Sequence, residues 1–189
     1  KSLKKKIISK IISPTLKALK SKNKPYNGFL YVGLMIKNNE PYLIEYNIRM
    51  GDPECQVILP RLKTDILKIF NHSIENKLNK IKIKWNKQKS MTIVLCAKGY
   101  PGTYKKNLKI KNMNKIRESK TNFIYHAGSK LFDKELRSSG GRVLNITSIG
   151  KNFLKIRNNI ISNIKRLNWK DGFYRKDIGW RVINKNENY

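Results

Sequence analysis

Apolar residues recur at two kinds of spacing along this chain, and each spacing predicts a type of secondary structure. Stripes with apolar side chains three and four positions apart predict amphipathic helices at residues 3–20, 56–74 and 152–167. Short apolar runs bounded by turn residues predict strands at 29–36, 42–48, 91–97, 123–127 and 142–148. The first two strands flank the turn 37–41 and form a predicted hairpin. Pro14 is expected to kink the first helix or to start a second one.

This mixture of hairpins and covering helices predicts an α+β fold. The polar, Lys-rich stretch 75–90 is a candidate boundary, so residues 1–84 and 85–189 are expected to form two domains. The aromatic and basic segment 171–181 receives no secondary-structure assignment.

The composition is strongly basic, with 42 Lys and Arg against 12 Asp and Glu and a net charge of +30 over 189 residues. Such a charge suggests a nucleic-acid partner. However, the lysines are spread along the whole chain, and only nine residues are Arg, the residue suited to bidentate phosphate and base contacts. Compositional drift therefore accounts better for the charge, and we expect no specific nucleic-acid partner.

Membrane and secreted classes are disfavoured. No run of 18 apolar residues occurs, so no membrane-spanning helix and no membrane partner are expected. The basic start is not followed by the apolar stretch of a signal peptide. Cys55 and Cys96 are too few for a disulfide scaffold, which favours a reducing, cytoplasmic location.

The informative polar pattern lies on the second predicted strand. Because side chains alternate between the faces of a strand, Glu45, Asn47 and Arg49 are expected on one side, with Ile44 and Tyr46 on the other. A carboxylate and an amide oxygen suit a hard cation such as Mg²⁺, and a guanidinium can neutralise phosphate charge. An ordinary polar strand face remains the alternative.

Several motifs together resemble one family. In order along the chain they are Tyr26–Ile36, Ile44–Glu54, Leu59–Leu62, Gly99–Gly102, His126–Gly128, Gly140–Leu144 and Phe173–Arg181. This series resembles the glycinamide ribonucleotide synthetase (phosphoribosylamine–glycine ligase) family of the ATP-grasp superfamily, from about residue 7 to residue 183. The resemblance implies the C-terminal part of an ATP-grasp domain at 1–84, followed by the family's small mixed α/β C-terminal domain at 85–189.

The resemblance also implies a reaction of purine synthesis, in which ATP is used to join glycine to 5-phosphoribosylamine through a glycyl phosphate. It assigns a Mg²⁺ or Mn²⁺ ion to Glu45 and Asn47, and the transferred phosphoryl group to Arg49. Ile44 and Met35 are expected to flank the adenine, with a plain core role as the alternative.

Five further residues are expected on the substrate side. Asp52 and Glu54 belong to the loop after the metal-binding strand. His126, Lys130 and Arg142 are candidates in the C-terminal domain, with ordinary structural or solvated roles as their alternative.

Family members are about twice as long as this chain. We therefore expect a missing N-terminal half as partner, in cis or as a separate chain, and no activity from this chain alone. The alternatives are another ATP-grasp enzyme, a truncated inactive ATP-grasp remnant and a basic nucleic-acid-binding module.

Overall fold

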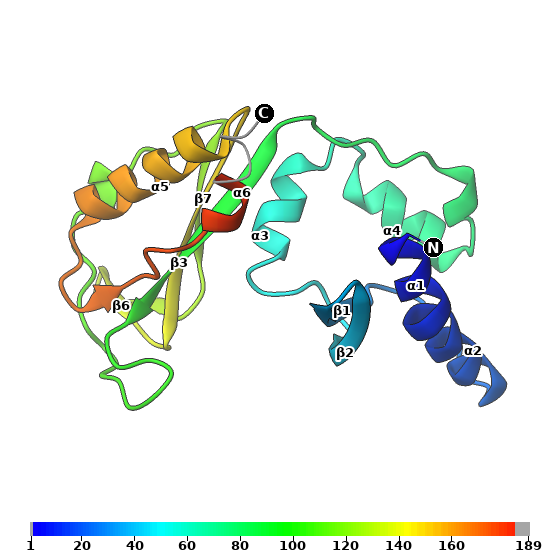
Figure 1. Ribbon diagram of the computed structural model, residues 1–189. Helices are drawn as coiled ribbons and strands as arrows, with labels where there is room; N and C mark the ends of the chain where they lie inside the picture. The colour runs from blue at the N-terminus through cyan, green and yellow to red at the C-terminus, as the bar shows by residue number, and fades with distance from the viewer. Residues whose placement is uncertain (1, 184–189) are drawn as a thin grey trace. The chain divides into compact units, whose positions relative to one another are not determined.

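The computed structural model describes residues 2–183, which fold into two compact units (Figure 1). Within that range, unit 1 holds residues 2–52 and 64–84, and unit 2 holds residues 53–63 and 85–183. Helices and antiparallel strands occur in both units, which confirms the α+β class. The assignment of residues 1–84 and 85–189 to two domains of a ligase stays a prediction. No helix among residues 2–183 is both long and apolar enough to cross a bilayer.

Unit 1 begins with a helical stretch in three parts, the last of which starts next to Pro14. It consists of α1 (Leu3–Ile7), the π-helical segment η1 (Ile8–Ile12) and α2 (Ser13–Ser21). Pro14 lies in the first turn of α2, directly after the π-helical segment. Proline cannot donate the usual helical hydrogen bond, and a wider turn before it accommodates that loss without breaking the helix.

A hairpin follows, formed by β1 (Tyr31–Lys37) and β2 (Glu40–Asn47). Asn38 and Asn39 join the strands, both with positive φ, which asparagine tolerates and two-residue hairpin turns require. The Nζ atoms of Lys6 and Lys10 donate to the carboxylate of Glu40, so the helical stretch is fastened to the turn end of the hairpin.

The helix expected over residues 56–74 is wrong as a single element. The structure has α3 (Cys55–Ile58), a 3₁₀ turn η2 (Leu59–Arg61) and a separate α4 (Ile66–Ile74). Pro60 prevents continuation of the first helix, and the carboxylate of Asp65 caps the second by accepting from Leu67 N at 2.7 Å. The short 3₁₀ helix η3 (Leu78–Lys80) ends this part of unit 1.

Unit 2 is built on a four-stranded antiparallel sheet of order β4-β7-β3-β8. Its strands are β3 (Lys89–Ala97), β4 (Asn122–His126), β7 (Arg142–Gly150) and β8 (Gly172–Phe173). The short hairpin β5 (Ser129–Phe132) and β6 (Glu135–Ser138) was not anticipated, because its strands are four residues each and mostly polar. The unassigned segment 171–181 contains β8 and the start of α6 (Trp180–Ile183). A 3₁₀ helix η4 (Met113–Lys115) lies between β3 and β4.

The helix α5 (Phe153–Leu167) covers one face of this sheet, and α3 contacts β3 and β7 from the other side (Figure 1). Asn152 caps α5 through its side chain, and Ile156, Ile160 and Ile164 lie buried against the sheet. Of the sixteen buried apolar residues in the described chain, fifteen lie in unit 2 and only Ile11 lies in unit 1. Unit 2 therefore has a core of its own, whereas unit 1 has almost none.

Candidate functional site

The carboxylate of Glu45 and the amide of Asn47 lie side by side on β2. Asn47 Nδ2 donates to Glu45 Oε1 at 3.0 Å, which holds the two side chains on the same face of the strand. Tyr46 lies on the opposite face, where its hydroxyl is 2.5 Å from Thr15 Oγ1 of α2. A carboxylate and an amide oxygen from neighbouring side chains of one strand face suit a hard cation that takes its remaining ligands from phosphate and water. The donor set thus fits the expected divalent ion.

Gly33 of β1 is the residue directly opposite Glu45. A Cβ atom on Gly33 would lie 3.0 Å from Glu45 Cγ, closer than an ordinary carbon–carbon contact. The missing side chain therefore leaves the room that the Glu45 side chain occupies. Within residues 2–183 no cluster of three or more His, Cys, Asp or Glu side chains could hold a metal by itself. A cation on Glu45 and Asn47 would therefore take further ligands of another kind, such as phosphate and water oxygens.

The regular alternation expected for β2 is interrupted next to this pair. The register shifts between Gly33 and Leu34, which pair with Glu45 and Leu43, so Ile44 is an additional residue in β2. At such a bulge two residues face a single partner, and Ile44 need not lie opposite Glu45. The side chain of Ile44 is 63% exposed, and that of Met35 on β1 is 58% exposed. Both are available to a ligand, and neither belongs to a buried core.

Arg49 does not extend the row of Glu45 and Asn47 as expected, because β2 ends at Asn47. Its side chain is exposed, and its Nη1 donates to Met50 O at 2.8 Å. Arg49 is thus placed by the loop after the strand. Asp52 and Glu54 follow in the same loop and are both half-buried, and Glu54 precedes α3, where its carbonyl accepts from Val57 and Ile58.

Three of the motifs singled out in the sequence meet in unit 2. Gly128 N donates to Arg142 O at 2.7 Å, and Gly140 N donates to Gly128 O at 3.1 Å. A Cβ on Gly128 would lie 2.7 Å from Gly140 Cα, and one on Gly141 would lie 2.1 Å from the Tyr100 ring. The loops at 99–102, 126–128 and 140–142 therefore pack with backbone against backbone and ring, a closeness that only glycine permits.

Two of the C-terminal candidates lie in this loop cluster. His126 ends β4, is exposed, and has its Nδ1 2.8 Å from Ser129 Oγ. Arg142 begins β7 and is half-buried. Lys130 lies on the β5–β6 hairpin opposite Arg137, with its Nζ 6.0 Å from the Phe132 ring centre. The structure thus brings His126 and Arg142 to one end of the sheet and places Lys130 on a neighbouring hairpin.

Sequence reasoning did not anticipate the contact of Ser129 with His126 or the packing of Tyr100 on Gly141. The contact between Ser129 and His126 could have been suspected, because the hydroxyl lies three residues after the histidine. The packing of Tyr100 on Gly141 joins residues 41 positions apart and has no local signal.

Burial changes the acidity of two groups near the loop cluster. It raises the pKa of the Cys96 thiol, and the positive charge of Arg142 partly opposes that rise. It also raises the pKa of Tyr125, to which Cys55 and Glu118 add. The Cys96 thiol and the Tyr125 hydroxyl are therefore both neutral at physiological pH. Neither group would act as an anionic nucleophile or base.

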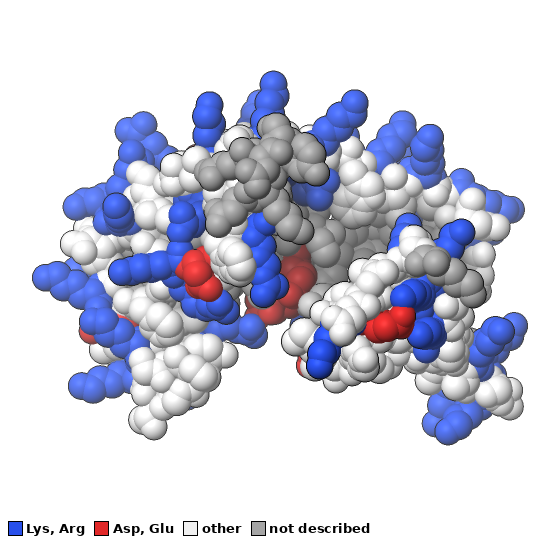
Figure 2. Space-filling model, viewed as in Figure 1, with Lys and Arg blue, Asp and Glu red and all other residues white. Residues whose placement is uncertain are grey.

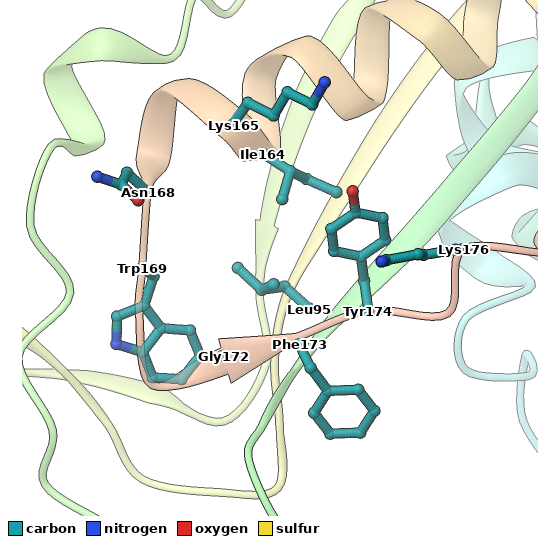
Figure 3. A pocket seen from close by; sticks show the side chains of 9 residues that line it. All are labelled: Leu95, Ile164, Lys165, Asn168, Trp169, Gly172, Phe173, Tyr174 and Lys176. Atoms are coloured by element: carbon teal, nitrogen blue, oxygen red, sulfur yellow. The ribbon is translucent and has the colours of Figure 1, made fainter.

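A hollow of about 380 Å³ lies elsewhere in unit 2, between the end of α5 and β8 (Figure 3). Polar residues that line it include Lys165, Asn168, Tyr174 and Lys176, and in Figure 3 the side chain of Lys176 reaches toward the Tyr174 ring. None of the candidate site residues lines this hollow. It therefore contributes nothing to the site predicted from the sequence.

Basic side chains are scattered over the visible surface of both units rather than gathered on one patch (Figure 2). A nucleic-acid interface is usually a basic patch or stripe on one face. The distribution in this view resembles solvated surface charge instead.

Two family models match the chain. "Phosphoribosylglycinamide synthetase, ATP-grasp (A) domain" matches residues 1–55, and "Phosphoribosylglycinamide synthetase, C domain" matches residues 90–181. The first match contains Glu45, Asn47 and Arg49, and the second contains the loop cluster of unit 2.

Curated relatives agree with these matches. The chain is 38% identical to a phosphoribosylamine–glycine ligase of Brucella melitensis over 173 residues, which is 92% of this chain and 40% of that protein. It is 40% identical to the ligase of the same name from Fusobacterium nucleatum over 180 residues, 95% of this chain and 42% of that protein.

A solved structure agrees as well. The crystal structure of a phosphoribosylamine–glycine ligase from Thermotoga maritima superposes with a TM-score of 0.71 at 28% identity, covering 90% of this chain and 41% of that one. The chain thus spans about 40% of the length of the relatives that it matches.

Proposed function

The chain belongs to the phosphoribosylglycinamide synthetase family, as its C-terminal portion, and we propose that it supplies part of the active site of an ATP-dependent phosphoribosylamine–glycine ligase. In the proposed reaction the carboxylate of glycine attacks the γ-phosphate of ATP, giving glycyl phosphate and releasing ADP. The amine of 5-phosphoribosylamine then attacks the acyl carbon, phosphate leaves, and the amine proton passes to solvent or a base. The product is glycinamide ribonucleotide.

The observation that carries this proposal is the pairing of Glu45 with Asn47 on β2, opposite Gly33. These two residues would hold Mg²⁺ or Mn²⁺ through a carboxylate and an amide oxygen. When bound, such a cation neutralises charge on phosphate oxygens. Arg49, in the loop after the strand, would add a guanidinium that can bind the transferred phosphoryl group or the acyl phosphate. Ile44 and Met35 would offer exposed apolar surface to the adenine.

The substrate side of the site is assigned to residues after β2. Asp52 and Glu54 would bind substrate from the loop that follows β2. His126, Lys130 and Arg142 would act from unit 2, where a histidine, an ammonium and a guanidinium suit the phosphate and hydroxyl groups of 5-phosphoribosylamine. These roles are supported by the family match and by the chemistry of each side chain.

The groups that bind the nucleotide from the opposite side would come from the N-terminal part of the ligase, in cis or as a separate chain. A site with one wall cannot exclude water or position the reactants. We therefore expect residues 1–189 alone to release no ADP in a glycine- and 5-phosphoribosylamine-dependent manner. We also expect a cytoplasmic location, because two cysteines are too few for the disulfide scaffold of a small secreted protein.

The test uses a fusion in which the N-terminal part of the Fusobacterium nucleatum relative precedes residue 1. In this fusion Glu45→Gln or Asn47→Leu should lower turnover at least about a hundredfold, a loss of roughly 2.7 kcal/mol of transition-state stabilisation. Glu75→Gln is the matched control, because Glu75 is an exposed carboxylate outside the proposed site whose side chain pairs with Lys77. Turnover near that of the parent fusion at limiting magnesium in both site variants would refute the metal role.

A further inference from the structure

Unit 1 exposes far more apolar surface than its size explains. Fourteen of the 22 large apolar side chains that are exposed in the described chain belong to it, although it is the smaller unit. It contains only one of the sixteen buried apolar residues. A folded unit without a core of its own needs another surface to bury its apolar side chains.

Part of this exposed surface forms a hollow of about 580 Å³ within unit 1, which we call the α4 hollow. Its apolar walls are Phe29 before β1, then Ile69, Phe70 and Ile74 of α4, and Leu78 and Ile83 after it. No charged residue lines it, although 42 of the 189 residues are Lys or Arg. A charged ligand such as a nucleotide or nucleic acid has no partner there.

The hollow is held open by specific contacts. Asn27 Nδ2 donates to Ser73 O at 2.6 Å, and Ser73 Oγ donates to Asn27 Oδ1 at 2.5 Å, which ties the segment before β1 to α4. The rings of Phe29 and Phe70 meet edge to face with centres 5.8 Å apart. Nevertheless Ile74 remains 73% exposed and Leu78 45% exposed. These side chains extend the apolar wall outward into solvent.

We propose that the α4 hollow is the docking site for the N-terminal part of the ligase, which inserts apolar side chains into it. This inference rests on the proposed function. The relatives are long enough to supply this occupant, because about 60% of their chain lies outside the region that this chain matches. The chemistry of the hollow also favours this occupant. An uncharged concave surface in a chain of net charge +30 fits apolar polypeptide side chains and no anion.

The test measures how accessible the hollow is to a small thiol reagent. Ile74→Cys places a thiol at the rim, and Leu131→Cys places one on the β5–β6 hairpin as a control, because Leu131 is 71% exposed against 73% for Ile74. Each variant is made in residues 1–189 alone and in the fusion with the N-terminal part of the Fusobacterium nucleatum relative. Iodoacetamide labelling of each site is followed by peptide mass spectrometry, which separates it from labelling of Cys55 and Cys96.

We expect the labelling rate at position 74 to fall at least about tenfold in the fusion, and the rate at position 131 to change by less than about twofold. Equal rates at position 74 in the fusion and the free chain would overturn the proposal. So would equal slowing at both positions, which indicates aggregation. Protection of position 74 in the free chain that grows with its concentration would also overturn it, because a second copy would then be the occupant.

A second variant separates this inference from the proposed function. Ile74→Asp should lower the melting temperature of the fusion, because it buries an unpaired carboxylate, and should leave that of the free chain unchanged. Equal melting temperatures of the Ile74→Asp and parent fusions would overturn the docking site. A fusion that protects position 74 yet forms no product supports the docking site and contradicts the ligase assignment. An active fusion in which position 74 is unprotected supports the ligase assignment and contradicts the docking site.

Discussion

Replacing Gly33 with alanine tests the position of the Glu45 carboxylate without touching a proposed ligand. The alanine Cβ would lie 3.0 Å from Glu45 Cγ, while carbon atoms in ordinary contact are about 3.5–4.0 Å apart. Glu45 must therefore move by a few tenths of an ångström. Its backbone atoms lie 3.6 and 3.7 Å from that Cβ, so the strand itself has room.

A shift of this size acts on catalysis more than on folding. Misplacing a reacting group by about 1 Å can cost a hundredfold in rate, so a smaller displacement should cost about tenfold, or about 1.4 kcal/mol. We expect Gly33→Ala in the fusion to lower turnover at limiting magnesium by this factor and to regain part of it at saturating magnesium. The melting temperature should stay within a few degrees of the parent, because Glu45 is exposed and can rotate away.

The assay is ADP release dependent on both glycine and 5-phosphoribosylamine, measured across a magnesium titration. Turnover of Gly33→Ala within about twofold of the parent at every magnesium concentration would refute the argument, because Glu45 would then tolerate displacement. Loss of turnover together with a large fall in melting temperature would also contradict it, since the strand pairing would have failed instead.

Three further predictions concern stability and charge. Ile160→Ala in α5 should lower the free energy of unfolding in urea by about 2–5 kcal/mol, because Ile160 is fully buried, while Leu154→Ala on the exposed face of the same helix should cost less than about 0.5 kcal/mol; equal losses would contradict the core assignment. Hydrogen bonds from Lys10 and Lys6 lower the pKa of Glu40 from 4.5 to about 2, so their support of the folded hairpin is complete above pH 4.5 and is lost as the pH falls toward 2. The protection of the β1–β2 amides against hydrogen exchange, corrected for the intrinsic pH dependence of exchange, should fall over that range, and Glu40→Gln should abolish this fall. Nucleic-acid binding at about 150 mM salt should be weak and independent of sequence, and a preference of about a thousandfold for one oligonucleotide would contradict the scattered-charge interpretation.

Local patterns in the sequence determined much of this protein. The apolar stripe of α5, the hairpin of β1 and β2, and the strands β3, β4 and β7 follow from spacing and turn residues alone. The motif around Glu45 and Asn47 placed both side chains on one strand face, because alternation is a property of any strand. The family itself was identifiable from motifs in order along the chain.

The break at Pro60 and the cap at Asp65 are local signals, but the periodicity of the stripe alone predicts one helix across them. Other features arose only when distant segments met. The bulge at Ile44 depends on the register with Gly33, which alternation within one strand cannot reveal. The short β5–β6 hairpin is stabilised partly through Lys109 and Arg137, whose side chains both donate to Glu135.

The arrangement of the sheet and the loops was also decided in three dimensions. The order β4-β7-β3-β8 pairs β3 with β7 and with β8, all remote from one another in sequence, and no local propensity specifies which strands become neighbours. The same pairing brings Tyr100, Gly128 and Gly141 into one cluster, where close packing requires glycine. Local sequence patterns determine which segments become helices and strands. Burial of their apolar faces determines which of these elements pack together, because the free energy of burial depends on contacts between residues remote in sequence.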